Sequence, residues 1–320
     1  ALRHLGQSVC VRYSTNLMMD RLTATRGPAL ASGVPWLQQR LRRWRERWLQ
    51  RRNRLLCETA QGWRPDLILV LWGNTLSPDL LTRLRGSARP ILATWWEDDP
   101  FRHSVEPLLP LYDFFFVFDR AYLEPLARAG TPRPRFLPCA CDETVYRPIR
   151  LSGTERRRYS SDVALIGWYY PRRAEVVRAL EGFDVRIWGR DWVQGRDLPT
   201  VRRERFVPDA VACRIYNAAK IGLNVHSDQT LEGGLNTRCF ELLAAGTFEL
   251  TDAVPEMEAL LQPGEEVAVY RSPEEARELV RHYLSHPEER ARVASRGRAR
   301  VLREHTYTHR MRSLLRQVGR

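Results

Sequence analysis

The stretch IGLNVHSDQTLEGGLNTRCFELLAAG, residues 221–246, joins an apolar run, a loop with two adjacent glycines and a helical pattern. The run that ends near Val225 predicts a buried strand, and residues 238–245 predict a helix that Gly246 ends. Ligands of open α/β sheets bind at the carboxyl ends of the strands, where this loop would lie. The stretch therefore predicts a strand–loop–helix unit with a ligand site at its loop.

The loop and the first helical turns carry groups that bind a phosphate or a sugar. Backbone N–H groups at a helix N-terminus attract anions, and glycines let a ligand approach closely. An arginine can pair with a phosphate, and a carboxylate can accept hydrogen bonds from a ribose diol. The same residues would also fit a plain capped helix. The candidate residues for binding the phosphate or sugar here are Gly233, Gly234, Asn236, Thr237, Arg238 and Glu241.

A second strand–turn–helix unit opens the same half of the chain, in DVALIGWYYPRR at residues 162–173. Gly167, Arg172 and Arg173 make it a second candidate anion site, although a solvated arginine pair would give the same pattern. Lys220 is the single lysine among 51 lysines and arginines, which makes it a candidate phosphate contact.

Short apolar runs alternate with helical patterns along the whole chain. Continuous apolar runs are typical of parallel sheets buried on both faces, and the alternation indicates doubly wound α/β domains. Strands are predicted at 8–14, 66–73, 90–96, 114–119, 135–139, 162–168, 184–189, 221–225, 247–251 and 266–270. Helices are predicted at 36–60, 77–86, 121–129 and 171–181 and from 273 to 319. The Pro- and Arg-rich segment 142–161 predicts a linker between two domains.

Composition narrows the class of protein. A hydrophobic content of 43% is typical of a globular chain, and no apolar run approaches the roughly 20 residues that a membrane helix needs. The net charge of +13 favours a phosphate-bearing substrate, another polyanion or an anionic membrane surface. Six scattered cysteines predict reduced thiols in a cytoplasmic protein, and the CAC at 139–141 lacks the usual zinc spacing. The chain opens on ALRHLG, a helix end capped by Gly6, so the usual first strand is either lacking or lies before Ala1.

Several segments resemble the CgeB-like (spore maturation protein) glycosyltransferases, which belong to the GT-B group. The most specific is LNTRCFELLAAG at 235–246, and AAKIGLNVH at 218–226, WWEDDPF at 95–101 and REHTYTHRM at 303–311 are also similar. The resemblance covers roughly residues 60–315.

The resemblance implies a GT-B fold, with two Rossmann-like doubly wound domains facing across a cleft. An acceptor-side domain would span 1–145, a nucleotide-sugar domain 146–300, and a helix at 301–320 would return to the first domain. The implied activity is that of a hexosyltransferase. It would move a sugar from a nucleotide-diphosphate sugar to a hydroxyl of a glycan, a protein or a cell-surface polymer.

Related retaining enzymes frame the donor with two glutamates eight positions apart. Glu241 fits the second of these positions, while Gly233 stands at the first. Retention is therefore expected, and an inverting reaction stays open. Enzymes of this type hold the diphosphate without a metal, so the resemblance implies no essential metal and no cofactor. Arg172, Arg173, Lys220 and Arg238 would stabilise the leaving group.

On the acceptor side, WWEDDPFRH at 95–103 follows a predicted strand. Asp98, Asp99 and His103 are the candidate catalytic residues, as a general base toward the acceptor hydroxyl. Acidic residues after a strand also cap the next helix, so a structural role is the alternative.

The segment WLQQRLRRWRERWLQRRNRLL, residues 36–56, carries eight arginines within 40–54. It also has an apolar stripe of Leu37, Leu41, Trp44, Trp48 and Leu55. The plainer expectation is a surface helix with this stripe on the core and its arginines in water. The sharper one is peripheral contact with anionic lipid at the inner membrane face, or with an acidic acceptor.

Two other functions remain open from the residues alone. An Arg-rich protein that binds polyanions without catalysis would explain the charge. No helix-turn-helix, RRM or zinc-finger pattern occurs, so no specific nucleic acid is expected. A GT-B sugar-nucleotide epimerase would share the donor site but differ in its product.

Overall fold

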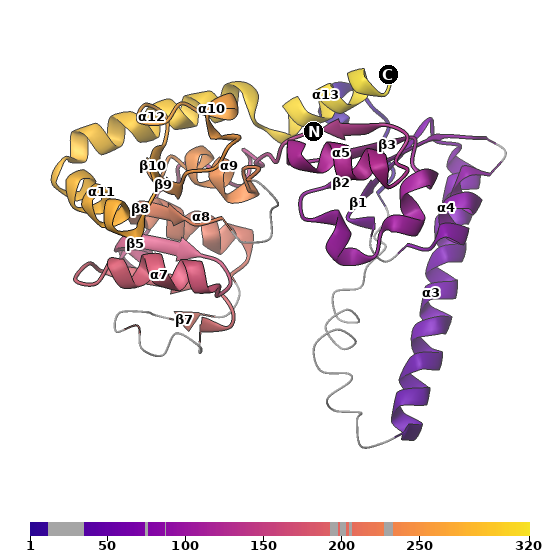
Figure 1. Cartoon of the computed structure of the whole chain (residues 1–320), viewed down its shortest axis with the longest axis horizontal. Helices are drawn as coiled ribbons and strands as arrows, with labels where there is room; N and C mark the ends of the chain where they lie inside the picture. Colours follow the sequence, from indigo (N-terminus) through magenta and orange to yellow (C-terminus); the bar gives the residue numbers. More distant parts are fainter. Residues whose placement is uncertain are drawn as a thin grey trace.

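The computed structural model describes residues 1–11, 35–73, 76–86, 88–192, 198, 203–204, 207–226 and 233–320. They form two α/β domains, each built on a parallel sheet (Figure 1). The predicted fold class is confirmed.

The N-terminal sheet has the strand order β1-β2-β3-β4, and each neighbouring pair is parallel. Its two faces pack against different elements because side chains alternate along each strand. Leu92 and Trp96 of β2 belong to the core on the α4 side, whereas Ala93 and Trp95 pack with α13. The strands are β1 (Leu67–Leu71), β2 (Ile91–Trp96), β3 (Phe114–Val117) and β4 (Pro134–Phe136). The helices are η1 (Arg3–Leu5), α3 (Pro35–Trp63), α4 (Pro78–Arg85), η4 (Pro100–His103), η5 (Glu106–Leu111), η6 (Arg120–Tyr122) and α5 (Leu123–Arg128).

The C-terminal sheet has the order β10-β9-β8-β5-β6-β7 and is also parallel throughout. Its strands are β5 (Ser161–Ile166), β6 (Val185–Trp188), β7 (Arg203–Glu204), β8 (Ala219–Asn224), β9 (Glu249–Asp252) and β10 (Ala268–Tyr270). The helices are α6 (Gly153–Tyr159), α7 (Pro171–Ala179), α8 (Asp209–Ala218), α9 (Thr237–Ala244), α10 (Met257–Leu260), α11 (Pro273–Ser285), α12 (Pro287–Glu304) and α13 (Tyr307–Gln317).

Two predictions about the chain's organisation were wrong. Residues 8–11 form no strand, and the rest of the predicted strand 8–14 lies outside the described residues. The predicted linker 142–161 contains α6, which begins with a capping box between Ser152 and Glu155. Local hydrogen bonds at that box outweigh the arginine-rich composition that suggested a linker.

Helix α3 leaves the body of the N-terminal domain along much of its length (Figure 1). Leu56, Cys57 and Ala60 near its C-terminal end pack on the core. Leu41, Trp44 and Leu55 of the predicted stripe are exposed instead of packed, so the plainer expectation for this helix was wrong. The side chain of Leu37 lies outside the described residues. None of the helices in the described ranges is long and apolar enough to cross a bilayer.

Helix α13 lies against the N-terminal domain although it follows the C-terminal domain in the chain (Figure 1). Met311, Leu314 and Val318 pack with Trp95 and Phe116 of the N-terminal sheet. Arg310 donates hydrogen bonds to the carbonyl oxygens of Pro138 and Cys139 at 2.8 and 3.0 Å. The last helix therefore joins the two domains.

Candidate functional site

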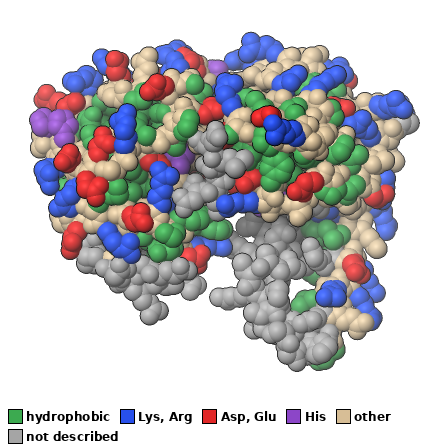
Figure 2. All heavy atoms as spheres, in the orientation of Figure 1, with side chains coloured by type: hydrophobic (Ala, Val, Ile, Leu, Met, Phe, Trp, Pro, Cys, Tyr) green, Lys and Arg blue, Asp and Glu red, His purple; other side chains and the backbone are tan. Residues whose placement is uncertain are grey.

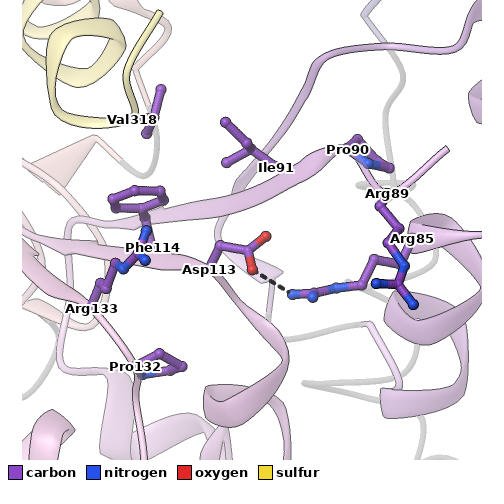
Figure 3. Close-up of a pocket in the computed structure, with 9 residues that line it drawn as sticks. All are labelled: Arg85, Arg89, Pro90, Ile91, Asp113, Phe114, Pro132, Arg133 and Val318. Carbon is purple, nitrogen blue, oxygen red and sulfur yellow. Dashed lines mark hydrogen bonds and ion pairs between the residues drawn. The ribbon is translucent and has the colours of Figure 1, made fainter.

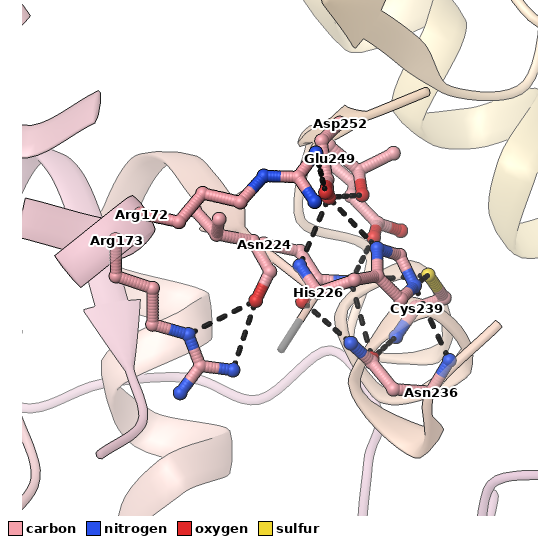
Figure 4. Close-up of polar contacts among 10 residues, drawn as sticks. Arg172, Arg173, Asn224, His226, Asn236, Cys239, Glu249 and Asp252 are labelled. Atoms are coloured by element: carbon pink, nitrogen blue, oxygen red, sulfur yellow. Dashed lines mark hydrogen bonds and ion pairs between the residues drawn. The ribbon is translucent and has the colours of Figure 1, made fainter. Parts of the chain in front are cut away.

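Helix α9 begins at a buried polar network (Figure 4). Asn236 is its N-cap, and its Oδ1 accepts from the backbone N–H of Cys239 at 3.2 Å. The Nδ2 of Asn236 donates to Asn224 at 3.0 Å, and Asn224 in turn donates to Glu249 at 3.1 Å. Both ends of the Asn236 amide are engaged within the protein. The structure thus gives Asn236 a capping role in place of the predicted ligand contact.

His226 extends this network to the end of β9. Its Nδ1 lies 2.7 Å from Oδ1 of Asp252, and its Nε2 accepts from the backbone N–H of Asn236. His226 thus links the N-terminus of α9 to Asp252. Burial opposes ionisation of Asp252, yet the hydrogen bonds from His226 and the charge of Arg172 lower its pKa. Arg172 pairs with Asp252 at 3.0 Å while its side chain is 48% exposed, so it still faces solvent.

Arg173 and Gly167 have structural roles, which corrects their predicted part in the donor site. Arg173 is buried, and its guanidinium donates to the carbonyl oxygens of Val225 and Trp168. A Cβ at Gly167 would lie 2.8 Å from Nη1 of Arg173, so glycine leaves room for the guanidinium. The pair holds the end of β8 against the turn after β5.

Lys220 lies away from the site, which corrects a second prediction. It is the second residue of β8, at the amino end of the strand, whereas the glycine loop follows the carboxyl end. Its Nζ pairs with Asp162 at 2.8 Å. A lysine in this position cannot reach a ligand on the loop.

The two loop glycines bind a carboxylate of the protein itself. Asp119, which follows β3, accepts from the backbone N–H groups of Gly233 and Gly234 at 3.1 and 2.9 Å. A Cβ at Gly234 would lie 2.8 Å from Cβ of Asp119, and Gly233 has a φ of 111°. These glycines are needed for contact between the domains and for a left-handed backbone, so their predicted role as a phosphate cradle is corrected.

Glu241 and Arg238 come from adjacent turns of α9. Burial raises the pKa of Glu241 to about 7, against the opposing effects of Arg238 and a hydrogen bond with Tyr146. The guanidinium of Arg238 bonds Tyr216, but its buried Nε has no hydrogen-bond partner among the described residues. A buried N–H group without a partner is costly, and a ligand that accepts from it would remove that cost.

Glu97 lies opposite α9 and was missed by reasoning from the sequence. It follows β2 directly, and a thiol, that of Cys139, bonds both Glu97 and Thr237 at the start of α9. Burial raises the pKa of Glu97 to about 7, and the charge of Glu241 adds to this rise. Its position could have indicated a site residue, because Glu97 directly follows a predicted strand and precedes Asp98 and Asp99, which were predicted instead.

The three predicted acceptor-side residues divide into two groups. Asp99 caps η4 by accepting from the N–H of Phe101 at 2.9 Å, so its predicted catalytic role is corrected to a structural one. Asp98 lies 3.7 Å from Nε2 of His103, and both side chains are about one quarter exposed. His103 and Asp98 therefore remain available at the carboxyl edge of the N-terminal sheet.

A pocket of about 400 Å³ lies elsewhere, at the amino edge of the same sheet (Figure 3). Arg85, Arg89 and Arg133 line it, and Arg85 pairs with Asp113 at 2.9 Å. Strands β2 and β3 begin there, at Ile91 and Phe114, so the pocket lies at the other end of the strands from Glu97. It is separate from the site between the domains.

Comparison with known proteins finds similar glycosyltransferase-like sequences. A family model described as "Glycosyl transferase-like" matches residues 172–316, which include α9 and its loop. The spore protein CgeB of Bacillus subtilis is 25% identical over 256 residues, which cover 73% of this chain and 77% of that protein.

Solved structures match the fold at low sequence identity. A sucrose-phosphate synthase from Thermosynechococcus elongatus matches 84% of this chain and 78% of its own, with a TM-score of 0.61 and 17% identity. Anabaena HepE, solved in complex with UDP-glucose, matches 84% of this chain and 82% of its own, with a TM-score of 0.63 and 13% identity. The two parallel-sheet domains, the family match on α9 and the similarity to CgeB together support a CgeB-like glycosyltransferase of the GT-B fold.

Proposed function

We propose that the chain transfers a sugar from a nucleotide-diphosphate sugar to an acceptor hydroxyl, with the donor held at α9. The observation that carries this proposal is the Arg238–Glu241 pair on α9, of which Glu241 lies within electrostatic reach of Glu97 in the other domain. The unpartnered Nε of Arg238 would donate to a phosphate oxygen, and Glu241 would accept from the ribose hydroxyls. The crystallised complex of HepE with UDP-glucose, a protein of the same fold, supports a donor of this class.

Among the predicted phosphate contacts, Arg172 and Arg238 remain. Arg172 is half exposed beside the loop that leads to α9, and it is held in place by Asp252. Two guanidinium groups would offset the charge that develops on the leaving diphosphate. We therefore propose that the reaction needs no metal, and activity that survives EDTA treatment is the expected result. Loss of activity in EDTA, with recovery on adding Mg²⁺, would contradict this part of the proposal.

On the acceptor side, the proposal places Glu97 and the Asp98–His103 pair next to the attacking hydroxyl. The bond between the sugar C1 and the diphosphate oxygen breaks, and a bond from C1 to the acceptor oxygen forms. In the retaining reaction that we propose, the hydroxyl proton passes to the departing diphosphate, and Glu97 orients the hydroxyl by accepting a hydrogen bond. Proton NMR of the first-formed product gives its anomeric configuration. An inverted product would instead assign the proton to a protein base.

The donor site is tested by thermal shift with UDP, GDP, dTDP and their sugar conjugates. A ligand that binds only the folded state raises the melting temperature by mass action. We expect one nucleotide class to raise it. We expect Glu241→Gln to lose most of the rise, because the substitution replaces one acceptor oxygen with an NH₂ donor and removes the charge that strengthens both hydrogen bonds.

The matched control is Glu258→Gln on α10, where the side chain is exposed and far from α9 in the chain. This variant should keep the full shift. If no nucleotide raises the melting temperature of the wild type, or if Glu241→Gln keeps the shift, the proposed donor site is wrong.

We also propose that α3 holds the enzyme at the inner face of an anionic membrane. Trp36 is 64% exposed and Trp44 is 52% exposed, and Arg43 and Arg45 flank Trp44 in the sequence. Tryptophan favours the membrane interface, and arginine attracts lipid phosphate. Over the face of the molecule in Figure 2, arginines are otherwise scattered among acidic side chains. Exposed tryptophan rings and an excess of positive charge occur together on α3. This combination favours α3 over the rest of the surface as the membrane contact.

Flotation with vesicles of phosphatidylglycerol and phosphatidylcholine tests the role of α3. We expect binding at low salt that is lost in the Trp36→Ala, Trp44→Ala double variant. Trp168→Ala is the control, because Trp168 is also 52% exposed but lies in the C-terminal domain. Absence of binding to anionic vesicles, or equal loss in the control, would rule out the membrane role.

A further inference from the structure

Three aromatic side chains form a group at the carboxyl edge of the N-terminal sheet. The rings of Trp72 and Trp96 are stacked, with centroids 6.4 Å apart and planes 5° apart. His103 leans over both, at 5.8 Å from Trp72 and 5.6 Å from Trp96. We call Trp72, Trp96 and His103 the aromatic platform. It adjoins Asp98, which pairs with His103.

Trp72 is held in an unfavourable backbone conformation while its ring stays in solvent. Its φ is 55°, which is an outlier for a bulky side chain, and its side chain is 43% exposed. Leu71 beside it is 60% exposed. Strained residues concentrate at functional sites, and exposed apolar groups mark binding surfaces. Folding alone gives no reason to place a tryptophan here, since burial would be the stabilising choice.

A buried polar atom of the platform lacks a partner. Nε1 of Trp96 has no hydrogen-bond partner among the described residues, and Trp96 is 1% exposed. This N–H group is a donor, whereas the carboxylate of Asp98 beside His103 is an acceptor. A ligand that meets both must carry groups that accept and donate, as hydroxyl groups do.

We propose that the aromatic platform is the acceptor subsite and that the acceptor is a carbohydrate ring stacked on Trp72. A pyranose has a face of C–H groups that packs on an indole ring, and a rim of hydroxyls that reaches the polar atoms around it. This inference rests on the proposed function, and it selects the glycan from the acceptor classes that the sequence left open.

The geometry separates a sugar ring from the other acceptor hydroxyls. A serine or threonine of a protein offers one hydroxyl and little surface for Trp72 to cover. An open-chain polyol offers hydroxyls without a flat C–H face. A pyranose offers both, and a ring on Trp72 brings its hydroxyls toward His103 and Asp98, where the reaction needs one of them.

Saturation-transfer NMR tests this subsite without the donor. The probes are maltose, cellobiose and lactose, with sorbitol as the open-chain polyol. We expect saturation at the ring C–H protons of at least one disaccharide and none for sorbitol. Trp72→Ala should weaken that binding about tenfold, and Trp72→Phe should restore most of it because a flat ring remains.

Trp44→Ala is the matched control, because Trp44 is also exposed but lies on α3. It should leave the disaccharide signals unchanged. Melting temperatures of all variants establish that they fold. Three results would overturn the proposal: no saturation of any disaccharide by the wild type, equal saturation of sorbitol, or undiminished disaccharide binding by Trp72→Ala.

The same proteins distinguish this proposal from the proposed function. Trp72→Ala should keep the nucleotide thermal shift, because its contacts lie on the N-terminal domain. A nucleotide shift without disaccharide binding would defeat the acceptor subsite alone. Disaccharide binding without any nucleotide shift would defeat the donor site and leave the platform as a sugar-binding surface.

Discussion

Three buried glutamates hold their protons more tightly than glutamate does in water. Burial raises the pKa of Glu97 and of Glu241 to about 7 and that of Glu249 to about 8. Glu97 and Glu241 face each other from different domains, whereas Glu249 is enclosed in the network behind α9. A single physical cause, desolvation, thus acts on two groups at the site and on one that supports it.

Glu249→Gln should flatten the dependence of stability on pH. The pKa of Glu249 rises from its usual 4.5 to about 8 in the folded state, so the folded protein keeps a proton that the unfolded chain releases. The contribution of this group to stability is therefore greatest below pH 4.5 and is lost as the pH rises to about 8. Urea midpoints at several pH values measure this. Equal slopes in the wild type and the variant would contradict it, and Glu258→Gln is the exposed control.

Glu97→Gln should lower the rate of sugar transfer without weakening the binding of the nucleotide donor. A pKa of about 7 leaves Glu97 partly ionised at neutral pH, where it can accept a hydrogen bond from the acceptor hydroxyl. We expect kcat to fall by about tenfold, with the nucleotide thermal shift unchanged, because an amide accepts a weaker hydrogen bond than a carboxylate does. Asp99→Ala is the comparison, because loss of the cap should lower stability by about 1 kcal/mol and spare kcat. A Glu97→Gln enzyme with normal kcat would remove Glu97 from the reaction.

At the scale of elements, α9 is positioned by two close contacts with its neighbours, and each contact leaves room only for glycine. A Cβ at Gly222 of β8 would lie 2.3 Å from Cδ2 of Leu242. A Cβ at Gly297 of α12 would lie 2.2 Å from the carbonyl oxygen of Glu266 and 2.7 Å from Leu243. Helix α9 is therefore packed between β8 and α12, and this packing sets where Arg238 and Glu241 point.

Gly297→Ala should destabilise the protein although alanine favours helices. Helix propensity alone would stabilise such a change by up to about 1 kcal/mol. The contact with a backbone carbonyl cannot relax cheaply, so a net loss of about 1–3 kcal/mol is expected. Gly62→Ala in α3 is the control, because nothing lies within 4 Å of its Cβ position. Denaturant midpoints should fall for the first variant and hold or rise for the second, and a stabilised Gly297→Ala would refute the packing argument.

At the scale of the whole molecule, hydrogen bonds join the domains at their carboxyl edges. Asp119 accepts from Gly233 and Gly234, and Glu256 accepts from the N–H of Arg120 at 3.0 Å. Helix α13 adds a second connection through Arg310. These contacts bring Glu97 to α9, so the site exists only when both domains are together.

Asp119→Ala should weaken the contact between the two domains. It removes a buried carboxylate that accepts from three backbone N–H groups, including that of Ala121, and each lost bond costs about 1–3 kcal/mol. Calorimetry should show a lower melting temperature and two separated transitions. Asp79→Ala is the control, since Asp79 forms an exposed pair with Arg83, and it should cost less than about 1 kcal/mol. A single unchanged transition in Asp119→Ala would show that the domains are held elsewhere.

The sequence by itself determined the fold class, most strands and helices, and the position of Arg238 and Glu241 on α9. These depend on local patterns: continuous apolar runs, strand–helix alternation and a cap such as Asn236. The family resemblance added the GT-B arrangement and the activity, because it rests on several segments of the sequence taken together.

Only the tertiary structure decided which polar groups remain free. Gly233 and Gly234 look like a phosphate cradle in the sequence, but Asp119 from more than a hundred residues away occupies them. Trp72 is a candidate site residue because its ring is exposed, and Glu97 because one of its buried oxygens has no partner among the described residues. Neither property can be predicted from residue spacing in the sequence. Local sequence sets backbone conformation through neighbours a few residues apart. The partners of a buried polar group come from any part of the chain, so its role is settled only when the domains have packed.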